Sequence, residues 1–135
     1  MSNGRRSIVW LSTASVLAHL LVSIVHGRTH ESLGVGLSSW QNTYVLTVIV
    51  FAPLIAMVLI WTRYARTGLL LLIVSMAGSL IFGIAYNYVV ISPDHVSHLP
   101  SGDAQGLFRT TALLLVVTEL FGVVIGLWAL RKNRN

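Results

Sequence analysis

The chain has 135 residues, of which 55% are hydrophobic and only 10% are charged, and its mean hydropathy is +0.78. Because a soluble domain carries about 25% charged residues, this composition excludes an ordinary soluble domain. The formal net charge is +5, and the absence of cysteine excludes disulfides, thiolate metal sites and cysteine nucleophiles.

Four apolar segments are long enough to cross the hydrocarbon core of a bilayer, which takes about 20 helical residues. We expect transmembrane helices at about residues 8–27, 43–62, 68–91 and 108–130. Few residues lie outside these spans, so the sequence predicts an all-α integral membrane protein. It should be an up-down four-helix transmembrane bundle that forms one domain over residues 1–135.

Seven of the nine basic residues fall on one side of this topology. They precede the first span, join the second to the third, or follow the fourth: Arg5, Arg6, Arg63, Arg66, Arg131, Lys132 and Arg134. The positive-inside rule then predicts that both termini are cytoplasmic. The same distribution argues against a nucleic-acid partner, because it reflects topology and contact with anionic lipid. Without a recognisable organelle-targeting segment, we expect a multi-pass protein of a prokaryotic plasma membrane.

The first span carries a polar stripe among apolar residues. Its members recur at helical spacing: Ser12, Ser15, His19, Ser23, His26 and His30. Such a stripe must face protein, water or a ligand, because lipid would leave its polar groups unpaired. The first span therefore predicts the working surface of the bundle.

The first outer connection covers residues 28–42 and leads into the second span. Leucine and valine alternate with glycine over residues 33–37, which favours an extended or re-entrant stretch at the membrane interface. Pro53 lies inside the second span and is expected to kink it.

The third span ends near Asn87, which could line a cavity, although a helix cap or a water contact is the simpler interpretation. In the second outer connection, Ser92 suits an N-cap and Pro93 suits the first helical position. We therefore predict one short helical turn at about residues 93–98. It would put His95 and His98 on the same side.

All five histidines fall in the outer half of the predicted topology. Imidazole suits zinc, copper and iron. We predict a transition-metal site made by His26 and His30 on the first helix together with His95 or His98. Asp94 would be a further ligand or would orient a ring. The alternative is that these side chains only make hydrogen bonds at the membrane surface.

Haem b is the second cofactor that the histidines could hold. His19 and His26 lie on one face, about 10.5 Å apart along the helix axis. Because the other three spans contain no histidine, the better haem site is near the outer surface, between His26 and a loop histidine. We rank it below a simple metal site.

Glu119 lies near the middle of the fourth span, at almost the depth of His19. An ionised carboxylate there costs about 2.5 kcal/mol or more, and pairing with His19 would relieve much of that cost. Such a pair could relay protons or bind a quinone-like headgroup. The alternative is a structural hydrogen bond from a protonated Glu119.

The sequence thus predicts a small polytopic membrane protein with a metal ion or haem at a histidine-rich extracytoplasmic site, for electron transfer or metal handling. The expected cofactor-binding residues are His19, His26, Glu119 and Asn87. One alternative is a noncatalytic accessory or assembly subunit, in a larger membrane complex or a homo-oligomer. Another is a proton-coupled or quinone-linked membrane enzyme that uses His19 and Glu119.

Overall fold

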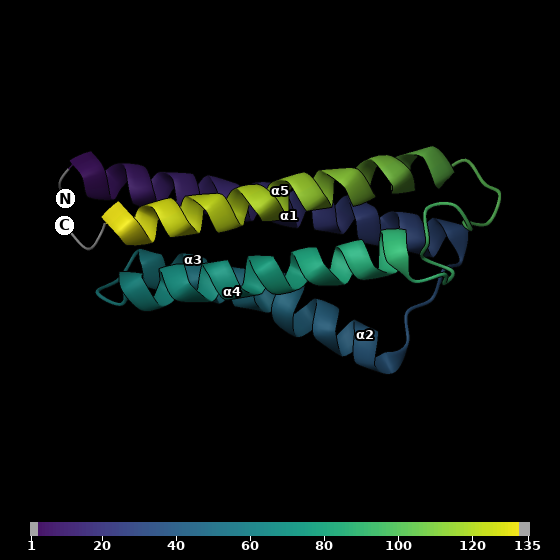
Figure 1. Cartoon of the computed structure of the whole chain (residues 1–135), viewed down its shortest axis with the longest axis horizontal. Coiled ribbons are helices and arrows are strands. Elements are labelled where there is room, and N and C mark those ends of the chain that lie inside the picture. The colour runs from purple at the N-terminus through teal and green to yellow at the C-terminus, as the bar shows by residue number, and fades with distance from the viewer. Residues whose placement is uncertain (1–2, 133–135) are drawn as a thin grey trace.

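The computed structural model describes residues 3–132, and every regular element in that range is a helix (Figure 1). In chain order the elements are α1 (Asn3–Leu33), α2 (Ser39–Tyr44), η1 (Val45–Phe51), α3 (Ala52–Ile60), α4 (Ala65–Ile84), η2 (Ala85–Val89) and α5 (Gln105–Lys132), where η denotes π-helix. Because α2, η1 and α3 are continuous, as are α4 and η2, these elements make four long helices.

Each of these four helices is long and apolar enough to cross a membrane. Large apolar side chains cover their outer surface. Leu21, Val74 and Ile81, for example, are 65%, 67% and 69% exposed. A surface of this extent is unfavourable in water and suits the acyl chains of a bilayer. The all-helical class and the four candidate spans are thus confirmed for residues 3–132, and they indicate a multi-pass membrane protein.

The four helices run up and down, so the start of α1, the end of α5 and the connection at residues 61–64 share one end (Figure 1). We call this the terminal end. Arg5 links two of these parts, because its guanidinium donates a 3.2 Å hydrogen bond to the carbonyl of Thr62. The connections at residues 34–38 and 90–104 lie at the opposite end, which we call the distal end.

The helices pack in the order α1, α5, α4, α3, and α1 contacts α3 only weakly. The terminal half of the bundle is filled by one apolar cluster. Its buried members are Ile8, Val9, Val16, Ala56, Ile60, Leu69, Leu72, Met76 and Ala129. Toward the distal end, α2 diverges from α1 and α5 (Figure 1). The bundle is therefore closed at the terminal end and open between α1 and α2 at the distal end.

Pro53 explains where the second helix changes its path. Pro53 has no N–H, so the carbonyl of Ile49 lacks its α-helical donor. The preceding turn is π-helical, and the N–H of Ala52 bonds the carbonyl of Thr47. The perturbation expected at Pro53 therefore takes the form of a π-helical turn, beyond which α2 diverges.

The first connection is much shorter than the predicted residues 28–42, because helices occupy both of its ends, whereas the extended stretch expected around residues 33–37 coincides with its non-helical part. Helix α1 continues to Leu33 and ends in a Schellman motif at Gly34, whose φ is +66°. The N–H groups of Gly34 and Val35 bond the carbonyls of Glu31 and His30 at 3.2 and 3.0 Å. Only residues 34–38 connect α1 to α2.

The helical turn predicted at residues 93–98 was also wrong. Two successive turns replace it, closed by bonds from His95 N–H to Ser92 and from His98 N–H to His95. A helix would need Val96 N–H to bond the carbonyl of Ser92, but this group donates instead to Asn87 at 3.0 Å. The long-range bond ties the connection to the end of η2.

Candidate functional site

A cavity of about 700 Å³ occupies the distal half of the bundle, where the helices separate. Its walls come from α1, the α2–η1 segment, the α4–η2 segment, α5 and both distal connections. Most of the lining surface is apolar, although ten of the 21 lining residues have polar side chains, among them His26, His30, Ser79, Asn87, Asp94 and Glu119. Small-molecule sites typically have this size and this composition.

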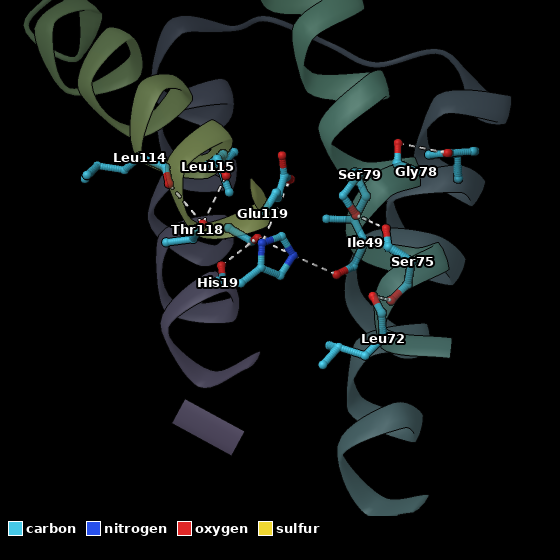
Figure 2. A network of polar contacts seen from close by, with 12 residues as sticks. His19, Ile49, Leu72, Ser75, Gly78, Ser79, Leu114, Leu115, Thr118 and Glu119 are labelled. Carbon is cyan, nitrogen blue, oxygen red and sulfur yellow. Dashed lines mark hydrogen bonds and ion pairs between the residues drawn. The ribbon is translucent and has the colours of Figure 1, made fainter. Parts of the chain in front are cut away.

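His19 and Glu119 meet at the base of the cavity (Figure 2). Both side chains are buried, and His19 Nδ1 lies 3.9 Å from Glu119 Oε1. This distance is too long for a direct hydrogen bond. Only Glu119 lines the cavity, so His19 lies behind it. The structure therefore brings together the two residues whose pairing the sequence suggested.

One hydrogen bond determines which nitrogen of His19 carries the proton. His19 Nε2 lies 3.1 Å from the carbonyl of Ile49, the same carbonyl that Pro53 leaves without an α-helical donor (Figure 2). Since a carbonyl can only accept, Nε2 donates. In the neutral imidazole Nδ1 then carries the free lone pair, and it faces Glu119.

Four buried polar atoms have no hydrogen-bond partner among the described residues: Ser12 Oγ, Ser15 Oγ, His19 Nδ1 and Glu119 Oε2. The serines of α4 differ, because Ser75 and Ser79 donate to backbone carbonyls of their own helix at 3.1 and 2.9 Å. Unpaired buried polar groups are rare in native proteins and commonly mark a bound water, an ion or a ligand. The polar stripe of α1 is therefore buried at four of its six positions and half-buried at Ser23 and His30, and it is incompletely satisfied.

Asn87 and Glu119 reach the same part of the cavity wall beside Gly83. A Cβ atom at Gly83 would lie 3.7 Å from Glu119 Oε2 and 3.9 Å from Asn87 Nδ2. The side chain of Asn87 is buried although it lies in η2, near the end of the third long helix. Gly83 thus leaves room for a carboxyl group and an amide group to face one ligand.

His26 and His30 line the cavity above Glu119 and pack on Phe108. Their ring centroids are 4.9 Å apart, and they lie 4.5 and 4.9 Å from that of Phe108. His30 Nδ1 lies 3.2 Å from the carbonyl of Val35 and therefore donates to it. Nε2 of His30 keeps its lone pair.

The hydroxyl of Thr111 orients His26 in a similar way. Thr111 Oγ1 lies 2.8 and 3.0 Å from the carbonyls of Leu107 and Phe108, so its single proton is used there. Its oxygen then accepts a hydrogen bond from His26 Nδ1, 2.9 Å away. Nε2 of His26, like that of His30, is thereby left to bind a ligand.

Asp94 comes from the second distal connection and is only 4% exposed. Burial raises the pKa of this carboxyl group, and nearby His30 partly opposes the rise. The structure therefore brings Asp94 to the side of the cavity that holds His26 and His30, as the sequence suggested.

His95 and His98 do not share this position. Their rings pair with each other, with Nδ1 atoms 3.3 Å apart, and Ser97 N–H donates to His95 Nδ1 at 3.2 Å. Within residues 3–132, no three His, Asp or Glu side chains are arranged so that they could hold a metal ion. The four histidines of the predicted metal site thus form two separate pairs, and the metal ion or haem stays a prediction.

An aromatic wall of the cavity was missed by sequence reasoning. Phe82 and Tyr86, one helical turn apart, line the cavity with ring centroids 4.8 Å apart. Tyr44 stacks on Phe82 at 4.8 Å and donates a hydrogen bond to the carbonyl of Gly78. The i, i+4 spacing of Phe82 and Tyr86 was the available signal.

The chain was also compared with protein-family models, with curated proteins and with solved structures, and none of these comparisons gave a match.

Proposed function

We propose that the four long helices span a prokaryotic plasma membrane with both termini in the cytoplasm, so that the cavity opens on the outer side. The basic residues at the terminal end support this orientation under the positive-inside rule. Six of them belong to the described part of the chain, and Arg134 lies outside it. The cavity is then in the outer leaflet.

The ligand that best suits this cavity is the polar head of a membrane-soluble molecule, namely a flat ring with hydrogen-bonding oxygens, as in a quinone. The observation that carries the proposal is Glu119 Oε2, which is buried without a partner beside Asn87 at the base of the cavity. An unsatisfied buried group costs about 1–3 kcal/mol, and a ligand oxygen would remove that cost.

The hydrogen-bonding groups of the cavity suit both states of a quinone. A protonated Glu119 and the amide of Asn87 would donate to ring carbonyls, because an ionised carboxylate inside a membrane is costly. Nε2 of His26 and of His30 would accept from the hydroxyls of the reduced form. Phe82 and Tyr86 offer aromatic faces and edges on which a flat ring can pack.

His19 has a positioning role in this proposal. Its neutral ring faces Glu119 with an acceptor nitrogen 3.9 Å away, which favours a proton on the carboxyl group. Of the two roles that the sequence offered for this pair, the proposal takes the binding of a quinone-like headgroup.

A metal ion or haem is the second candidate, and it rests on two imidazoles that line the same cavity, those of His26 and His30. A third ligand would have to move into place, because no three His, Asp or Glu side chains within residues 3–132 are arranged to hold a metal ion. The free Nε2 atoms of the two imidazoles suit zinc, copper or iron. An accessory or assembly subunit of a larger membrane complex would need no ligand in the cavity at all.

The test is binding of 2,3-dimethoxy-5-methyl-1,4-benzoquinone, which has no tail, to the purified chain in lipid nanodiscs by calorimetry. Glu119→Leu should weaken binding about tenfold or more, because it removes the donor, whereas Glu119→Gln should bind nearly as well as the native chain. The control is Thr118→Val, whose hydroxyl bonds only carbonyls of its own helix (Figure 2).

Absence of binding, or equal binding by Glu119→Leu, would contradict the proposal. Metal analysis of the same preparation separates the other candidates. A stoichiometric ion that is lost in His26→Ala would favour the metal site. A colourless, metal-free chain that binds no quinone would favour the accessory role.

A further inference from the structure

A second, smaller hollow adjoins the cavity on the membrane-facing side of the bundle. Its volume is about 280 Å³ and it lies between α1 and the η1–α3 segment. It is lined by Leu20, Ser23, Ile24, Val45, Val50 and Leu54. Ser23 and Val45 also line the larger cavity, so the two spaces are neighbours with a shared wall.

The hollow offers a ligand no free polar group, although one serine lines it. The hydroxyl of Ser23 donates to the carbonyl of His19 at 2.8 Å, so it needs no further partner. Every other side chain in the lining is aliphatic. Ile24 is 64% exposed, and Leu21, on the preceding turn of α1, is exposed too, so the hollow opens on the surface that faces lipid.

The fold explains why the hollow lies at this position. The π-helical turn before Pro53 belongs to one wall, and α2 diverges from α1 just beyond it (Figure 1). Helices α1 and α3 contact each other weakly, so no neighbouring helix fills the gap. A gap between two helices at this depth lies between the polar cavity and the surface that faces lipid.

We infer that this hollow holds the apolar tail of the ligand whose polar head occupies the larger cavity, so the natural ligand is an amphipathic lipid with an aliphatic or isoprenoid tail. The inference rests on the proposed function and names the class of ligand more narrowly. The tail would enter from the membrane between α1 and η1. The shared wall at Ser23 and Val45 would then lie where the head joins the tail.

The experiment compares two probes on the chain in nanodiscs: the tail-less benzoquinone used above and its decyl derivative. Each buried methylene strengthens binding about fourfold, so the native chain should bind the decyl compound at least about tenfold more tightly, after correction for its partition into lipid. Val50→Trp fills the hollow without touching the larger cavity and should reduce this preference to about twofold or less. Binding of the tail-less probe should stay within about twofold of the native value, because the head site is left intact.

The matched control is Val58→Trp, which puts the same side chain on the 60% exposed lipid-facing surface of α3. It should keep the full preference for the tail. If Val50→Trp does not fold, Ile24→Trp fills the hollow from the opposite wall. The chain has no cysteine, so Ile24→Cys introduces a single thiol that can be labelled selectively. The decyl compound should slow the labelling of this thiol.

Equal affinity of the native chain for both probes, or an undiminished preference in the filled variants, would overturn the inference. If the decyl compound does not slow labelling at residue 24, an ordinary acyl chain or another copy of the protein occupies the hollow, and the inference also fails. Different results would contradict the proposed function: the tail-less probe would not bind, or it would bind the native chain and Glu119→Leu equally well.

Discussion

The same four helices pack tightly in the terminal half of the bundle and separate around a cavity in the distal half. In the terminal half, Ile60, Leu69 and Leu72 are completely buried, and the backbones of α3 and α4 approach closely at Gly68. In the distal half, η1 is π-helical and Tyr44 stacks on Phe82 of the aromatic wall. The α2–η1 segment thus packs on α4 and lies apart from α1, and the cavity forms between them. The comparison indicates that the terminal half holds the fold, and under the proposed function the distal half binds the ligand.

The largest effect is expected from a change in the terminal half. A Cβ atom at Gly68 would lie 2.8 Å from both the carbonyl oxygen of Ala56 and the nitrogen of Ile60, so the backbones of α3 and α4 must separate. Gly68→Ala should lower the free energy of unfolding by about 2–3 kcal/mol in detergent, measured by thermal or denaturant unfolding. Gly106→Ala is the control, because a Cβ there meets nothing within 4 Å. Equal stability of the two variants would show that this close approach is unimportant.

The corresponding change in the distal half should affect binding and spare stability. Gly83→Val adds atoms beside Glu119 and Asn87 at ordinary contact distance, where the cavity has room for them. Binding of the tail-less benzoquinone should weaken about tenfold, because the new side chain occupies the space of the head. Ile81→Phe, on the lipid-facing side of α4, should leave binding unchanged. A Gly83→Val variant that unfolds easily but binds normally would reverse the division of roles.

A smaller loss of stability should follow removal of the group that orients His26. Thr111→Val leaves the buried Nδ1–H of His26 without its acceptor and should cost about 1–2 kcal/mol of unfolding free energy. Thr110→Val, where an exposed hydroxyl bonds only its own helix, is the matched control and should change stability very little. If the two valine variants unfold alike, the hydrogen bond of His26 contributes nothing to the distal half.

The smallest effect concerns the pH dependence of the distal half. Because the pKa of Asp94 is raised by burial, the folded state favours its protonated form. The stability that the protonated Asp94 carboxyl group contributes is therefore complete below the pKa of Asp94 in the unfolded chain. This stability is lost as the pH rises through the higher pKa of Asp94 in the folded chain. Asp94→Asn, which stays neutral, should lose less melting temperature between pH 4 and 7 than the native chain. Parallel melting curves of the two chains over that range would contradict this assignment.

The sequence predicted those features that depend on periodicity. The four long apolar segments became the four helices, and the spacing of Ser12, Ser15, His19 and His26 correctly placed these side chains on a buried face. The depths of His19 and Glu119 followed from counting residues along two antiparallel helices, which suggested their proximity.

Features that depend on a choice between hydrogen-bond partners were not predictable in this way. Val96 N–H donates to Asn87 rather than to Ser92, and this long-range bond replaced the expected helical turn. The Schellman motif at Gly34 extended α1 beyond the expected end of the first helix. The cavity itself depends on the divergence of α2, and Pro53 indicated where the second span would be perturbed but not the direction in which α2 would leave the bundle.

The central claim is that Glu119 donates a hydrogen bond to a ligand in the distal cavity, and difference infrared spectroscopy tests it most directly. The chain contains only four Asp and Glu residues, so its carboxylic acid bands are few. Addition of the tail-less benzoquinone should shift a protonated carboxyl band to lower frequency, and that change should be absent in Glu119→Gln. A spectrum without any carboxylic acid change on binding, or the same change in Glu119→Gln, would contradict the account.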